Sequence, residues 1–217
     1  MARIPETEVM NDPASVDAYT AETFGGGLAT FLMYKLQKNT DNLTIADIGC
    51  GNMAYAPILN TIYPNSVFTA YDASSLMLEK ANLIIDQEKV TLVNSFIPDV
   101  TLPNQAYDIV LSSLFLHQLP DPAPCWDTIK QIGKIGGTFC VFDLLRVEDS
   151  AICTEIVEGM SANAPEVCKT DFYNTLRASF TIDEIKQQLL DAGITAEVKT
   201  EEIYPNCFVV YVFGIIS

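Results

Sequence analysis

Positive charge is scarce in this sequence. Lysine and arginine together number 12 against 28 aspartates and glutamates, and there is one histidine, so the formal net charge is −16. Nucleic acids and anionic membranes are both held through lysine and arginine side chains. The composition therefore disfavours nucleic acid and membrane partners, and we expect a small-molecule ligand. It does not indicate an oligomeric state.

A long apolar run is also absent. Hydrophobic residues make up 49% of the chain and the mean hydropathy is +0.20. The best candidate run, Cys207–Ile216, is still shorter than the roughly 18 residues that suggest a membrane span. The first residues, Met-Ala-Arg-Ile-Pro-Glu-Thr-Glu, lack the apolar region of a secretion signal. We expect a cytoplasmic protein in which the polar residues 1–12 are loosely held.

Paired cysteines are missing as well. The chain has six cysteines, at positions 50, 125, 140, 153, 168 and 207, without any C-x-x-C pair. Zinc sites and disulfide frameworks both need such spacing. The sequence predicts reduced thiols and no metal site.

What is present is organised around Thr44–Asn52, which reads Thr-Ile-Ala-Asp-Ile-Gly-Cys-Gly-Asn. The short apolar run has no helical period, which predicts a buried parallel strand, and the two glycines predict a tight turn after it. Asn52 is suited to cap a helix over residues 54–62. A strand, a glycine turn and a helix start are together typical of a nucleotide site.

Two nucleotides fit this pattern. Gly49–Ala54 matches G-x-G-x-x-A, and Asp72 follows about twenty residues later, as in dinucleotide sites. Asp47 argues against NAD, because a carboxylate beside the glycine turn would repel a pyrophosphate. The same carboxylate would attract the ammonium and sulfonium of S-adenosylmethionine (SAM). An NAD-dependent oxidoreductase stays open as an alternative.

The chain resembles the class I SAM-dependent methyltransferases that act on small molecules. Four stretches carry the resemblance in order: Asp47–Asn52, Tyr71–Ser74 with Met77 and Leu78, Tyr107–Ser113 through Leu116–Leu119, and Gly136–Thr138, the last as the turn into the fifth strand. No Asn-Pro-Pro-Tyr follows the fourth strand, which disfavours methylation of DNA bases.

The rest of the pattern fits an α/β fold with a doubly wound, mostly parallel seven-stranded sheet. Strands are predicted at 43–48, 67–71, 90–94, 107–112, 137–143, 195–203 and 207–215, with helices between them. The short Tyr204–Asn206 connection makes the last pair antiparallel, as the resemblance implies. We expect a single domain, residues 1–217, made of a helical N-terminal cap (1–42), a SAM-binding core (43–145), a helical insertion (146–180), and a last helix with the strand pair (181–217).

The resemblance implies a set of cofactor-binding residues. Asp47 would orient the methionine end, the glycines would let it lie on the backbone, and Asp72 would accept from the ribose hydroxyls. The third strand lacks the acidic residue that often binds adenine, so the adenine contacts are assigned to a polar and aromatic stretch. The full set is Asp47, Gly49, Cys50, Gly51, Asn52, Asp72, Ala73, Met77, Asn94, Ser95, Phe96, Ser112 and Leu114.

The acceptor side is less patterned. His117, just past the fourth strand, is the candidate catalytic base, with a structural role as the alternative. Tyr19 and Phe24 are candidate lid residues, with core packing as the alternative. Polar residues expected near the acceptor are Asp143, Arg146, Tyr173 and Arg177, and paired arginines would suit a carboxylate or phosphate.

The predicted function is methyl transfer from SAM to a small-molecule acceptor by in-line displacement. Positioning of reactants alone can supply roughly 7–11 kcal/mol, so no metal or nucleophile motif is required. The alternatives are the NAD-dependent oxidoreductase and a non-catalytic SAM-binding protein. The acceptor itself is not readable from the residues.

Overall fold

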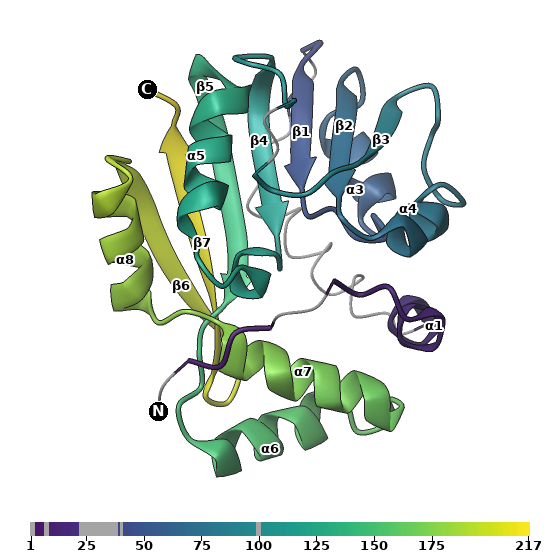
Figure 1. Ribbon diagram of the computed structural model, residues 1–217, viewed down its shortest axis with the longest axis vertical. Coiled ribbons are helices and arrows are strands. Elements are labelled where there is room, and N and C mark those ends of the chain that lie inside the picture. The colour runs from purple at the N-terminus through teal and green to yellow at the C-terminus, as the bar shows by residue number, and fades with distance from the viewer. Residues whose placement is uncertain (1–2, 7–8, 22–38, 40, 99–100) are drawn as a thin grey trace.

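A computed structural model describes residues 3–6, 9–21, 39, 41–98 and 101–217. A seven-stranded sheet forms its centre, in the order β3-β2-β1-β4-β5-β7-β6, with helices on both faces (Figure 1). Strand β7 is antiparallel to both of its neighbours, and the other strands run parallel to one another. The predicted doubly wound sheet with an antiparallel last strand is confirmed.

The elements follow the predicted alternation. The strands are β1 (Thr44–Ile48), β2 (Val67–Asp72), β3 (Val90–Asn94), β4 (Tyr107–Ser113), β5 (Gly133–Leu144), β6 (Ala196–Tyr204) and β7 (Cys207–Ile215). The helices are α1 (Pro13–Ala21), α3 (Ala56–Ile62), α4 (Ser75–Ala81), η1 (Leu116–Gln118), α5 (Ala123–Ile132), α6 (Ser150–Met160), α7 (Glu166–Ala178) and α8 (Ile182–Asp191). None of these described helices is long and apolar enough to cross a membrane.

The sheet buries both faces, because alternate side chains of each strand point to opposite sides. On one face Ile45 and Phe142 pack in a cluster with α3 and α6. On the other face Ala46 and Val141 pack in a cluster with α5 and α8, around the fully buried Trp126. Central strands buried on both faces read as the continuous apolar runs seen in the sequence.

The chain reverses direction across the sheet at β1, which pairs with β2 on one side and β4 on the other. A crevice at the carboxyl ends of such strands is where α/β folds bind ligands. Helices α1, α6 and α7 lie beyond these strand ends (Figure 1). The topology therefore directs the search for a site to the segments after β1, β2, β4 and β5.

Three local predictions were wrong. The third helix starts at Ala56 rather than residue 54, and its N-cap position is Tyr55. Asn52 instead accepts a hydrogen bond from the Ala54 N–H. Strand β5 begins at Gly133, so Gly136 and Gly137 lie within the strand, where its register against β4 shifts. A Cβ at Gly137 would lie 2.8 Å from the Asp108 carbonyl oxygen, so close strand packing explains this glycine.

The N-terminal prediction was wrong in part. Residues 3–6 are not loosely held: the Ile4 N–H donates to the Arg177 carbonyl, and Arg3 bonds to several backbone carbonyls. Helix α1 lies within the predicted helical N-terminal cap. The lid candidate Phe24 lies outside the described residues.

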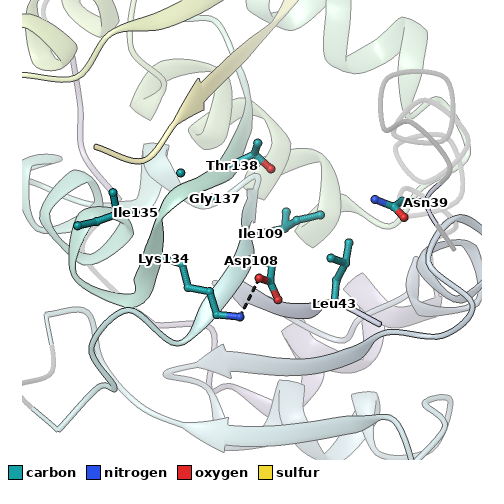
Figure 2. A pocket seen from close by; sticks show the side chains of 9 residues that line it. Asn39, Leu43, Asp108, Ile109, Lys134, Ile135, Gly137 and Thr138 are labelled. Atoms are coloured by element: carbon teal, nitrogen blue, oxygen red, sulfur yellow. Dashed lines mark hydrogen bonds and ion pairs between the residues drawn. The ribbon is translucent and has the colours of Figure 1, made fainter. Parts of the chain in front are cut away.

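A shallow groove lies at the opposite end of the sheet, between the starts of β1, β4 and β5 (Figure 2). Lys134 reaches across it to Asp108, with 2.7 Å between Nζ and Oδ1. Asp108 also accepts from the backbone and hydroxyl of Thr44. These bonds join the starts of β1, β4 and β5, so the polar groups of the groove hold the strands together.

Candidate active site

The turn after β1 requires its glycines. Gly49 has φ +70° and Gly51 has φ +54°, which residues with a Cβ adopt at a cost. A Cβ on Gly49 would lie 2.3 Å from the Phe115 ring, whereas one on Gly51 would have no atom of the described residues within 4 Å. The N–H groups of Gly49 and Cys50 both donate to the Tyr71 carbonyl. The loop is therefore folded back over the end of β2, with Gly51 on its open side.

Asp47 is the unusual group in this turn. Its side chain is fully buried, and its Oδ2 accepts from the Tyr55 hydroxyl at 2.6 Å. Its Oδ1 has no hydrogen-bond partner among the described residues. Burial raises the pKa of Asp47 to about 7, against the lowering effect of the Tyr55 hydrogen bond. A buried carboxylate oxygen without a partner is costly, and a cationic ligand donor would satisfy it.

Asp72 joins the glycine turn to the next helix. At the end of β2, its Oδ2 accepts from the Gly51 N–H at 2.7 Å and its Oδ1 from the Ser74 N–H at 2.8 Å. Burial raises the pKa of Asp72, while these N–H bonds lower it. A carboxylate has about four acceptor sites, so capacity for two ribose hydroxyls is left. The capping of α4 is done by Ser74, which accepts from the Met77 N–H.

The residues after β3 form the side assigned to adenine. Asn94 is fixed by its side-chain amide, which donates to the carbonyls of Asp72 and Ala73. Phe96 is 64% exposed, so its ring is available for stacking on a base. Met77 is buried beneath the start of α4. The Asn94 amide hydrogens are thus used within the protein, and the apolar groups offer the clearer contact to a base.

The end of β4 closes the crevice. Ser112 donates from its hydroxyl to the Ile48 carbonyl, and Leu114 adopts a φ of +52°. A positive φ is uncommon for a side chain such as leucine and marks local strain. This bend brings Phe115 against Gly49. Strand β4 therefore shapes the glycine turn through an aromatic side chain.

His117 in η1 is held by Asp143 at the end of β5. Nδ1 of His117 lies 2.7 Å from Oδ1 of Asp143, and the His117 N–H donates to Oδ2 at 2.9 Å. Both side chains are buried. Burial lowers the pKa of His117, but the charge and hydrogen bond of Asp143 outweigh it, and the pKa is raised. With Nδ1 donating to the carboxylate, Nε2 is the free position for a proton. Asp143, expected at the acceptor rim, thus orients His117.

Helices α1 and α7 supply the far wall. Tyr19 of α1 has its pKa raised by burial and by the charges of Asp72 and Glu6. On α7, the Arg177 guanidinium donates to the Tyr173 hydroxyl at 3.3 Å. The structure therefore brings Tyr19, Tyr173 and Arg177 to elements that face the strand ends.

Arg146 follows β5, whereas Arg177 lies in α7. Arg146 bonds to Glu184 of α8, with 2.9 Å between Nη2 and Oε1, and its side chain is only 6% exposed. Glu184 is also the third residue of a capping box with Thr181. The two arginines thus belong to different elements, and Arg146 is engaged by a carboxylate of this chain.

Four residues with contacts in the crevice escaped the sequence prediction. Tyr55 lies eight positions after Asp47, across the glycine turn, where neither helical nor strand spacing indicates a contact. No local sequence pattern indicated Phe115, Arg3 or Glu6, because their partners lie far along the chain. Glu6 places its Oε2 3.9 Å from Nε2 of His117.

Comparison with known proteins agrees with this geometry. Residues 46–141 match the family model described as a methyltransferase domain. A malonyl-[acyl-carrier protein] O-methyltransferase of Priestia megaterium is 30% identical over 105 residues, 48% of this chain and 37% of that protein. The 27-O-demethylrifamycin SV methyltransferase of Amycolatopsis mediterranei is 26% identical over 162 residues, 70% of this chain and 54% of that protein. The chain thus spans about half the length, or less, of these curated relatives.

The fold is also that of solved methyltransferases. A SAM-dependent methyltransferase from Aquifex aeolicus superposes with a TM-score of 0.63 at 19% identity, covering 86% of this chain and 89% of that chain. Residues 46–141 are thus similar in sequence to a methyltransferase domain, and the chain shares its fold with solved methyltransferases. The NAD-dependent alternative is not favoured.

Proposed function

We propose that this protein transfers a methyl group from SAM to a small-molecule acceptor. The observation that carries the proposal is the buried Oδ1 of Asp47 beside the glycine turn, which has no hydrogen-bond partner in the part of the chain that the structure describes. It lies at the strand switch point where this fold binds nucleotides. A ligand with a positive methionine end suits this carboxylate, and a pyrophosphate would be repelled.

The chain's own residues fit the ligand along its length. Asp47 accepts from the ammonium group, and Gly49 and Gly51 keep the backbone clear for the methionine moiety. Asp72 accepts from the ribose hydroxyls with the capacity left after its two N–H bonds. Phe96 stacks on the adenine. The remaining residues assigned to this side are Cys50, Asn52, Ala73, Met77, Asn94, Ser95, Ser112 and Leu114.

His117 is proposed as the base for the acceptor. When bound, SAM supplies an activated methyl group whose leaving group is a neutral thioether. His117 takes the proton from an acceptor hydroxyl or amine at Nε2, while Asp143 holds the ring in one tautomer. Tyr19, Tyr173 and Arg177 line the acceptor side, and Arg146 supports it through α8. Net charge of −16 favours a small-molecule acceptor over nucleic acid.

Equilibrium binding tests the cofactor assignment. Calorimetry with SAM, its demethylated product and NAD should show binding of the first two and none of the third. Asp72→Ala should weaken SAM binding by roughly 100-fold, because hydrogen bonds to a charged group are each worth about 1.5–3 kcal/mol. Glu155→Gln, on the exposed surface of α6, is the matched control. Unchanged affinity in Asp72→Ala would refute the ribose role.

Transfer tests the activity. Incubation with methyl-labelled SAM and a metabolite extract should place label on a small molecule. Tight SAM binding without any labelled product would instead support the non-catalytic SAM-binding alternative.

A further inference from the structure

The first described residues are built into the wall of the crevice. In Figure 1 this N-terminal segment runs between α7 and the ends of β4 and β5. The Arg3 guanidinium lies 3.8 Å above the Phe180 ring. It also donates to backbone carbonyls on both sides of the segment, those of His117, Leu119, Pro120 and Ala178. The segment is therefore anchored at Arg3 to both η1 and the end of α7.

Because Arg3 anchors the segment, the acidic residue Glu6 lies next to His117. Its Oε1 accepts from the Thr175 hydroxyl of α7 at 3.0 Å, which leaves Oε2 to face Nε2 of His117 at 3.9 Å. The Glu6 side chain is 26% exposed, whereas that of His117 is 4% exposed. The imidazole therefore lies between two carboxylates, with Asp143 bonded at Nδ1 and Glu6 standing off from Nε2.

We propose that Glu6 is a positioning residue for proton transfer, which makes the N-terminal segment part of the acceptor site. The Glu6 carboxylate stabilises the imidazolium that forms when Nε2 takes the acceptor's proton. The inference rests on the proposed methyl transfer. In that step the acceptor's O–H or N–H bond breaks, its proton goes to Nε2, and its electron pair forms the bond to the methyl group. The sulfur keeps the electron pair of the broken S–CH3 bond.

The geometry separates this role from simple anchoring. Arg3 attaches the segment through backbone carbonyls and a ring, and needs no histidine side chain to do so. Glu6 contributes a charge at the one ring nitrogen that Asp143 leaves open. The 3.9 Å separation exceeds a hydrogen bond, so an acceptor atom can bond to Nε2 while the carboxylate still acts through space.

The charged groups around His117 support this role of Glu6. The groups facing His117 are Asp143 from β5 and Glu6 and Arg3 from the N-terminal segment. The two carboxylates raise the pKa of His117, and Arg3 lowers it. Burial raises the pKa of Glu6, and the charge of Asp171 of α7 raises it as well. Removing the Glu6 charge should therefore lower the pKa of His117.

The single histidine makes this directly measurable. NMR titration of the imidazole in the full-length protein reports the pKa of His117 without any acceptor. Glu6→Gln should lower that pKa by about one unit, the low end of the effect of an opposite charge at 4–6 Å. Glu6→Asp keeps the charge and should retain most of the shift. Glu155→Gln is the control for loss of a remote charge and should change nothing.

Activity completes the test. With the acceptor found in the transfer assay, Glu6→Gln should move the acidic limb of the kcat profile, where the base is lost by protonation, to lower pH by the same one unit and lower kcat about tenfold at the native optimum. SAM affinity by calorimetry should stay within about twofold. An unshifted histidine pKa, or an unshifted kcat profile in an active Glu6→Gln variant, would overturn the inference. Absence of transfer by the native protein would overturn the proposed function instead.

Discussion

The two halves of the crevice are built in different ways. The cofactor half uses neighbouring backbone: the glycine turn bonds to the end of β2, and Asp72 bonds to Gly51 only 21 positions away. The acceptor half uses side chains from opposite ends of the chain: Arg3 reaches carbonyls 114 to 175 positions away, and Glu6 bonds to Thr175 across 169. The first half therefore has a local sequence signature, and the second does not.

The comparison predicts that backbone changes will damage the cofactor half most. Gly49→Ala places a Cβ 2.3 Å from the Phe115 ring at a positive φ. Overpacking and left-handed strain should together lower the free energy of unfolding by about 3 kcal/mol and abolish SAM binding. Urea denaturation and calorimetry measure both effects.

Gly51→Ala is the matched control. It has the same backbone requirement but open space around the added atom, so about 1 kcal/mol of strain is expected. If the two variants lost the same free energy of unfolding, contact with Phe115 would not shape the turn.

Asp47→Asn should separate binding from stability. The folded pKa of about 7 lies above the value of about 3.9 for an unfolded aspartate. The native protein therefore loses stability progressively as the pH rises from about 4 to 7, because the unfolded state releases this proton in that range while the folded state keeps it. The variant should weaken SAM binding about 100-fold, yet its free energy of unfolding at pH 8 should exceed that of the native protein by up to about 4 kcal/mol, since about three pKa units at about 1.4 kcal/mol each are no longer lost.

The stability gain should nearly vanish at pH 4, where the folded state holds the proton and about half of the unfolded state does. Thermal unfolding of the ligand-free protein at pH 4 and pH 8 checks the sign. A variant that is equally or less stable at pH 8 would contradict the assigned burial cost.

Arg3→Ala should have the smallest effect. The loss of function should be limited to the acceptor half. Losing a charged donor to several carbonyls should lower the free energy of unfolding by about 1–2 kcal/mol. Methyl transfer should fall about tenfold because Glu6 is no longer held, while SAM affinity stays within about twofold. Denaturation, transfer kinetics and calorimetry measure these changes.

Lys199→Ala, an exposed pair with Glu197 on the edge strand β6, is the control for loss of a surface cation. A fall in SAM affinity in Arg3→Ala equal to the fall in transfer would show that the two halves are not separable.

The same contrast explains what could be predicted from the residues. The doubly wound seven-stranded sheet, the antiparallel β7 and the capping box of Thr181 and Glu184 follow from patterns that are local or that the resemblance implies. The prediction for the strand over 137–143 was wrong at its start, because Gly137 serves close packing between β4 and β5, and Gly136, at φ +82°, lies within the strand where its register shifts. A contact across strands leaves no local pattern.

The sequence alone determined the order of strands and helices and the glycine turn with its carboxylate, since periodicity, glycine conformation and charge act over a few residues. Only the tertiary structure decided which oxygen of Asp47 lacks a partner, that Asp143 orients His117, and that the N-terminal segment carries Glu6 to the same ring. Those outcomes depend on burial and on distances between residues far apart in the chain, which packing sets and composition does not record.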